Sequence, residues 1–182
     1  VVEGTEYPLN CLIFATGFEV GTDYSRRTGF DVVGRDGVTL TEAWAGGVRT
    51  LHGLVVAGFP NLFVESIAQS GFTVNFPYLL DVQAGHVAWI IAWALGHDAV
   101  EVEATPVAQD AWVQAVVARS VGTAERARSC TPGYYNREGQ ADATTRQGSF
   151  FLGGPTEYAD ILRHWRADGT LDGFTIRRGG TA

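Results

Sequence analysis

The longest regular pattern in the sequence covers residues 73–95, and it limits the possible folds more than any other feature. One side of this stretch is mostly apolar at helical spacing, which predicts a single long helix. Thr73 is its candidate N-cap, Pro77 falls in the first turn, where proline is tolerated, and Gly96 ends the helix. The expected buried face consists of Phe76, Leu79, Leu80, Gln83, Val87, Ile90, Ile91 and Ala94.

Short apolar runs around this helix predict strands. Residues 9–15 and 54–57 have the composition of strands that are buried on both faces of a parallel sheet. A hairpin is expected to turn at Asp36-Gly37. Because strands alternate with helices, the predicted class is α/β, and the small number of strands is what an incomplete domain would have. The remaining expected elements are strands at 100–103 and 173–177, and helices at about 107–127 and 156–168.

The composition is that of a globular protein without a basic face. Hydrophobic residues make up 46% of the chain and charged residues 18%, and the net charge is -7, which argues against non-specific nucleic-acid binding. The first residues lack a signal-peptide pattern, and the apolar run 87–95 is shorter than the ~20 residues of a membrane span. We therefore expect a cytoplasmic protein without membrane contact. Cys11 and Cys130 have no ligand spacing, so no metal site is expected.

No self-standing catalytic motif occurs in the sequence. It contains no GxSxG, HExxH, GxxxxGK or GxGxxG pattern, and its four histidines are scattered. Two backbone features are candidate ligand sites instead. Thr16 and Gly17 follow a predicted strand, and α/β sheets bind ligands at the carboxyl ends of their strands. Residues 69–76 lead into the long helix, whose N-terminal N–H groups could bind a flavin edge or a phosphate, or could simply form a capped turn.

Motifs in order along the chain resemble one family of flavoenzymes. Residues 10–18, NCLIFATGF, are similar to the motif D-x-[LI]-[IV]-x-A-T-G-[FY] of class B flavoprotein monooxygenases, with Asn10 in place of Asp. Further on, LTEAW, RTLHGL and GFPNLF follow one another as they do in Baeyer–Villiger monooxygenases. Residues 129–139 and 153–165 resemble C-terminal motifs of that family. The resemblance covers residues 6–178.

The resemblance implies a fold and a division of the chain. The chain is expected to be the C-terminal portion of a flavoprotein with two dinucleotide-binding, Rossmann-like domains, with an incomplete FAD domain. Residues 1–18 would be the strand that links the NADP domain to the FAD domain. Residues 19–128 would belong to the FAD domain, and residues 129–182 would form a lid loop followed by a closing helix and strand.

The resemblance also implies an activity and a set of site residues. An enzyme of this family uses FAD and NADPH to insert one oxygen atom of O2 next to the carbonyl of a ketone or aldehyde, giving an ester or lactone. The residues carried over as cofactor-binding are Thr16, Gly17, Val74, Asn75 and Phe76. The residues carried over as the substrate pocket are Ser70, Gly71, Phe72, Thr73, Tyr134 and Tyr135, with Phe72 as the expected size filter. No residue is assigned a catalytic role.

Several parts that the family needs are absent from the sequence. These are two GxGxxG fingerprints, an FxGxxxHxxxW-type signature, and an arginine at a position that matches the family's catalytic one. The chain alone is therefore expected to be inactive and to need the missing N-terminal segments. Two alternatives remain open: another flavin monooxygenase that oxidises nitrogen or sulfur, and a truncated, non-catalytic module with a structural or interaction role.

Overall fold

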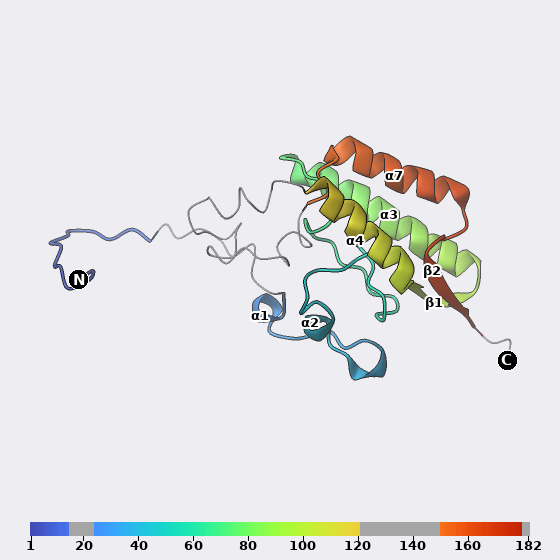
Figure 1. The fold of residues 1–182 in the computed structure, drawn as a ribbon, viewed down its shortest axis with the longest axis horizontal. Coiled ribbons are helices and arrows are strands. Elements are labelled where there is room, and N and C mark those ends of the chain that lie inside the picture. Colours follow the sequence, from blue (N-terminus) through green and yellow to red (C-terminus); the bar gives the residue numbers. More distant parts are fainter. Residues whose placement is uncertain (15–23, 121–149, 180–182) are drawn as a thin grey trace.

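The structure is a computed structural model that describes residues 1–14, 24–120 and 150–179. Figure 1 shows a body of helices beside two strands, with an N-terminal arm that stands away from that body. Helix and strand are mixed, as the α/β prediction requires. The described elements are α1 (Tyr24–Thr28), the 3-10 helix η1 (Arg35–Gly37), α2 (Leu40–Ala43), α3 (Phe76–Gly96), β1 (Ala99–Ala104), α4 (Pro106–Arg119), α7 (Gly154–Asp168) and β2 (Phe174–Arg178).

Helix α3 is the predicted long helix, and its cap differs from the prediction. It begins at Phe76 because Asn75 is the N-cap: the Asn75 side chain accepts a hydrogen bond of 3.2 Å from the Tyr78 N–H. Thr73, the predicted cap, accepts instead from the Asn75 N–H at 3.1 Å. The helix ends at Gly96, as predicted.

The buried face of α3 follows the predicted spacing along most of its length. Its buried residues are Leu79, Gln83, His86, Ile90 and Ala94. Phe76 and Ile91, which were expected on this face, are 42% and 44% exposed. By length and composition α3 could cross a membrane, and among the described residues no other helix could. It packs against α7 and β1.

Strands β1 and β2 confirm two predicted strands and form an antiparallel pair. Val102 lies opposite Ile176, and Ala104 lies opposite Phe174. Helix α7 confirms the predicted helix at 156–168, beginning slightly earlier. Helix α4 confirms the first part of the predicted helix 107–127, and the remaining residues 121–127 lie outside the described part. The turn at Asp36-Gly37 is also confirmed, with φ of 56° and 79°, as a type I′ hairpin turn requires.

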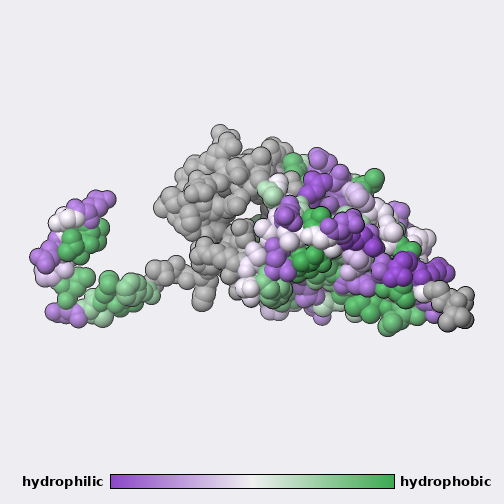
Figure 2. Space-filling view, turned by 90° about the horizontal axis from the view of Figure 1, so that it is seen from below, coloured by the Kyte–Doolittle hydropathy of each residue, from purple (hydrophilic) through white to green (hydrophobic). Residues whose placement is uncertain are grey.

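Both apolar runs predicted as buried strands need correction. Residues 9–14 form no strand and are exposed, with 81% of Ile13 open to solvent. No described strand lies beside them, so their backbone has no ladder partner and their side chains no sheet to cover them. Figure 2 shows hydrophobic side chains of this arm interspersed with hydrophilic ones. Residues 54–57 are buried, but they form a turn with isolated bridges from Val55 to Leu51 and Phe63 instead of a strand.

The main hydrophobic core joins segments that are far apart in the sequence. It contains Leu51 and Leu54 from the buried turn together with side chains from α3, α4 and α7. The other buried members of this core are Val55, Leu79, Ala104, Trp112, Val116, Phe151, Tyr158 and Leu162. Residues before and after position 128 therefore share one core.

Candidate functional site

The predicted substrate segment lies between the buried turn and the start of α3. Gln69, Ser70 and Gly71 are buried, and Phe72 is exposed. The Ser70 hydroxyl donates to the carbonyl of Ser66 at 2.8 Å. Because this bond turns the Ser70 side chain into the protein, Ser70 does not line the surface depression beside it.

That depression has a volume of about 160 Å³ and contains several predicted site residues. Gly71, Phe72 and Thr73 lie on its wall, together with Phe76 from the start of α3. Its lining carries no charged side chain, so it suits an apolar ligand. The full lining is Ile67, Gly71, Phe72, Thr73, Phe76, Leu79 and Phe150.

Phe150 completes this depression, and the sequence reasoning missed it. Its ring lies 4.6 Å from the ring of Phe72, measured between centroids. The contact depends on backbone pairing: the Phe151 N–H donates to the Ser70 carbonyl at 2.8 Å, and Phe151 forms a parallel bridge with Gly71. No local pattern in the sequence predicts that residues 70–71 pair with Phe151, which lies about 80 positions later in the chain.

Helix α7 lies so close to residues 70–73 that only glycine fits at position 71. A Cβ atom on Gly71 would lie 2.8 Å from the Cβ of Tyr158, so a larger residue would push the segment away from α7. The Tyr158 hydroxyl donates to the His52 carbonyl at 2.7 Å. Burial raises the pKa of Tyr158. The tyrosine is therefore a neutral, fixed support behind the depression.

The start of α3 offers backbone donors next to the depression. Val74 is 98% exposed, and Asn75 caps the helix with its side chain. Within the described part of the chain, the N–H groups of Val74 and Phe76 donate to no protein acceptor. A helix N-terminus carries a partial positive charge, so these donors can bind an electron-rich or anionic group.

A buried polar cluster lies behind the site. The His52 ring packs edge-on against His86 and Trp112, with 5.3 Å between centroids in each pair. Burial lowers the pKa of His52 to about 4 and that of His86 to about 3. His52 Nδ1, Gln83 Oε1 and His86 Nε2 have no hydrogen-bond partner among the described residues. Neither histidine lines the depression, so neither supplies a proton donor to it.

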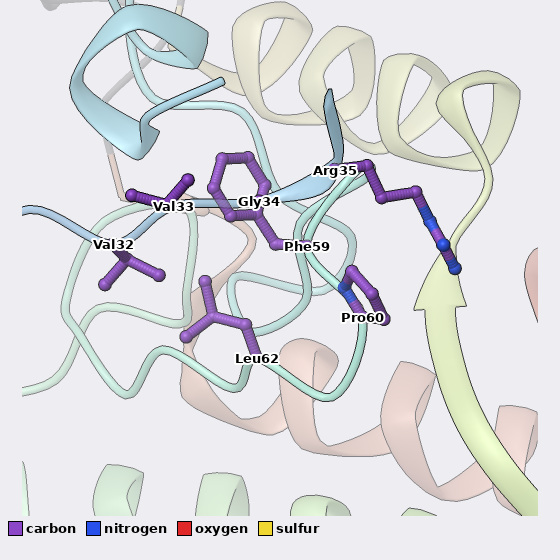
Figure 3. A pocket seen from close by; sticks show the side chains of 7 residues that line it. All are labelled: Val32, Val33, Gly34, Arg35, Phe59, Pro60 and Leu62. Atoms are coloured by element: carbon purple, nitrogen blue, oxygen red, sulfur yellow. The ribbon is translucent and has the colours of Figure 1, made fainter. Parts of the chain in front are cut away.

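A second depression, of about 250 Å³, lies elsewhere and contains none of the predicted site residues. Figure 3 shows Phe59, Pro60 and Leu62 on one side of it, facing the segment that carries Val32. The Arg35 side chain points away from it toward β1, where it pairs with Glu101 at 2.7 Å and with Glu103 at 3.1 Å. Because these ion pairs neutralise Arg35, the depression offers no unpaired charge to a ligand.

Four predicted site residues lie outside the described part of the chain: Thr16, Gly17, Tyr134 and Tyr135. In the part that is described, no cluster of three or more His, Cys, Asp or Glu residues could hold a metal ion. The structure therefore brings together Gly71, Phe72, Thr73 and Phe76, with Val74 and Asn75 at the helix start beside them.

Known proteins resemble this chain over nearly its full length. A Baeyer–Villiger monooxygenase of Streptomyces coelicolor is 43% identical over 169 residues, which are 92% of this chain and 28% of that protein. The structure of a polycyclic ketone monooxygenase from the fungus Thermothelomyces thermophila matches 98% of this chain and 29% of its own, with a TM-score of 0.79 and 36% identity. A steroid monooxygenase bound to NADP matches 98% of this chain and 32% of its own, with a TM-score of 0.77 and 31% identity. No family model matches the chain.

These matches cover nearly all of this chain but less than a third of each known protein. The chain spans about 30% of the length of the curated relatives it matches. Its fold is thus that of part of a flavin- and NADP-dependent α/β monooxygenase, as the motifs predicted.

Proposed function

We propose that this chain, which corresponds to part of a Baeyer–Villiger monooxygenase, contributes the substrate wall and one flavin contact of such an enzyme. The whole enzyme would use FAD and NADPH to insert one oxygen atom of O2 next to a ketone or aldehyde carbonyl, giving an ester or lactone. FAD supplies the oxygen chemistry when bound, and the residues of this chain bind, orient and shield. The observation that carries the proposal is the apolar depression beside the open start of α3.

The flavin contact is proposed at Val74, Asn75 and Phe76. The N–H groups of Val74 and Phe76, which donate to no acceptor within the described chain, lie at the positive end of a helix of 21 residues and fit the electron-rich pyrimidine edge of a flavin. The Asn75 side chain is already used as the cap, so its role there is to hold the helix start in place. Thr16 and Gly17 remain proposed cofactor contacts on the motif alone.

The substrate pocket is proposed at Gly71, Phe72, Thr73 and Phe150. The two phenylalanine rings form an apolar wall that fits the hydrocarbon part of a ketone. Phe72 would set the size limit, because it is exposed at the depression and its ring contacts the half-buried ring of Phe150. Ser70 is proposed as a support of this segment, since its hydroxyl is bonded inward. Tyr134 and Tyr135 stay in the proposal as pocket residues from the lid region.

The proposed place of the chain in the whole enzyme follows the division by motif. Residues 1–18 would join a sheet formed with other segments, which accounts for the exposed hydrophobic side chains of the arm. Residues 19–128 would belong to the FAD domain, and residues 129–182 would form the lid loop followed by the closing helix and strand. The chain would be cytoplasmic, and it would turn over no substrate without the segments that carry the two GxGxxG fingerprints.

A chimera tests this function directly. In it, the chain replaces the 169 residues it matches in the Streptomyces coelicolor relative. We expect the chimera to retain FAD, to oxidise NADPH faster when a cyclic ketone is added, and to form the lactone, which is detected by mass spectrometry. Neither half on its own should do so. A chimera that folds but retains no FAD would contradict the proposal and would favour a non-catalytic module. Oxidation of amines or sulfides, but not ketones, would favour the other flavin monooxygenases.

A substitution at Phe72 tests the pocket within the same chimera. Phe72→Ala should lower KM for bulky cyclic ketones by about tenfold relative to small ones, because it removes the ring at the rim. Phe30→Ala is the matched control: Phe30 is also an exposed phenylalanine, at 62%, and it does not line the depression. An equal change in both variants would show that Phe72 does not shape the pocket.

A further inference from the structure

We propose that Gln69 is a positioning residue, which fixes the direction in which residues 70–73 leave the core and so sets the shape of the depression. The proposal rests on the function proposed above and assigns a role to a residue that does not itself line the depression. Gln69 is completely buried. It lies two residues before Gly71 in the chain.

The side chain of Gln69 is bonded at both ends of its amide. Its Oε1 accepts from the N–H of Thr50 at 2.9 Å and from the hydroxyl of Thr50 at 2.5 Å. Its Nε2 donates to the carbonyl of Val48 at 2.8 Å. A buried amide whose oxygen and nitrogen both bond to a neighbouring segment cannot rotate without leaving buried polar groups unsatisfied. The side chain therefore ties the site segment to residues 48–50.

The backbone of Gln69 also contacts two other parts of the chain, Trp112 and the turn at Gly53. Its carbonyl accepts from Nε1 of Trp112 on α4 at 3.1 Å. A Cβ atom on Gly53 would lie 2.9 Å from the same carbonyl oxygen, so that turn packs closely against it. Gln69 also has φ of 58°, in the left-handed region that a glutamine adopts only when its surroundings require it. The surrounding bonds thus impose a sharp change of direction at this residue.

Three lining residues of the depression, Gly71, Phe72 and Thr73, follow this change of direction within four positions. The Ser70 carbonyl accepts from the Phe151 N–H, and Gly71 forms its bridge with Phe151. Phe72 then meets Phe150 on the wall. Without the hydrogen bonds of Gln69, residues 70–73 could change direction. The backbone pairing that brings the Phe150 ring to the Phe72 ring would then weaken.

The experiment compares two buried glutamines in the chimera. Gln69→Leu removes the amide that holds the site segment. Gln109→Leu is the matched control, because Gln109 is 7% exposed and its Oε1 accepts from the Ala57 N–H at 2.9 Å, away from the depression. Both variants should melt at a lower temperature. Only Gln69→Leu should raise KM for a cyclic ketone by about tenfold, while flavin reduction by NADPH stays within about twofold. An equal rise in KM for both would overturn the proposal.

A milder variant keeps the test decisive if Gln69→Leu does not fold. Thr50→Val keeps the shape of the side chain and removes the hydroxyl that donates to Gln69, so KM should rise by about threefold. Unchanged KM in Thr50→Val would count against the proposal.

Hydrogen exchange supplies a readout that does not depend on activity. The amide of Phe151, which donates to Ser70, should exchange at least about tenfold faster in Gln69→Leu and at an unchanged rate in Gln109→Leu. Equal protection of this amide in both variants would overturn the role of Gln69. If the unaltered chimera fails to bind FAD while the exchange result holds, the proposed function fails and the positioning role stands.

Discussion

Residues 9–14 and residues 54–57 are both short apolar runs, yet the first run is exposed and the second is buried. Leu54, Val55 and Val56 are at most 1% exposed, whereas Leu9 and Leu12 are each 64% exposed. The buried run has partners in the described chain, through bridges to Leu51 and Phe63 and contacts with α3, α4 and α7. The arm has none there. An apolar run therefore encodes a tendency to be buried, and its neighbours decide whether burial happens.

The largest expected effect separates the two runs by the same substitution. Leu54→Ala should lower the free energy of unfolding of the chain by about 3 kcal/mol, because it opens a cavity in the main core. Leu12→Ala should change it by less than about 0.5 kcal/mol, since this side chain is exposed. Urea unfolding of the two variants at neutral pH measures both. Equal losses would mean that the arm is packed in solution.

The second effect is a pH dependence that arises beside the buried run, at His52. His52 sits in the same turn as Leu54, and burial lowers its pKa from 6.5 to about 4. The unfolded chain therefore binds more protons than the folded chain below pH 6.5, so stability is complete above that pH and falls as the pH drops toward 4. The expected loss between pH 7.5 and pH 5 is about 2 kcal/mol for His52 alone.

The groups facing His52 make this loss larger rather than smaller. His86 on α3 lies edge-on to it, is itself neutral with a pKa lowered to about 3, and has Arg166 of α7 beside its Nδ1 at 3.1 Å. No carboxylate among these neighbours would stabilise a charged imidazole. Urea unfolding at pH 7.5 and pH 5 should show a smaller loss in His52→Gln and an unchanged loss in His164→Gln, which alters an exposed histidine. A flat profile in the unaltered chain would refute the prediction.

How far the sequence could predict the fold depends on how local each signal is. The spacing along α3, its end at Gly96 and the Asp36-Gly37 turn are set by neighbouring residues, and these predictions were confirmed. The N-cap moved from Thr73 to Asn75 because both are good caps and only the tertiary position of the segment decides between them. The strand predicted at residues 54–57 failed because the turn at Leu51 folds those residues back on themselves.

In the candidate site, too, only the residues with a local sequence signal could be predicted. Gly71, Phe72 and Thr73 could be found from the motif and from the helix start that follows them. Phe150 and Gln69 could not, because one depends on a backbone pairing across the chain and the other on a hydrogen-bond network with Thr50 and Trp112. Such contacts depend on the packed fold, which no sequence window contains.

The smallest expected effect is that of Ile13→Ala on the unfolding of the chain, and it should become much larger in the chimera. This difference tests directly whether the exposed arm is buried in the whole enzyme. Ile13 is 81% exposed, so Ile13→Ala should leave the unfolding of the chain unchanged within about 0.5 kcal/mol. If the arm joins a sheet in the whole enzyme, the same substitution in the chimera removes a buried side chain and should cost about 2 kcal/mol. The measurement is urea unfolding of both proteins, with Val38→Ala as a control at an exposed β-branched residue outside the arm. A negligible loss in the chimera would mean that residues 9–14 stay uncovered even beside the remaining segments, and the proposed linking strand would have to be abandoned.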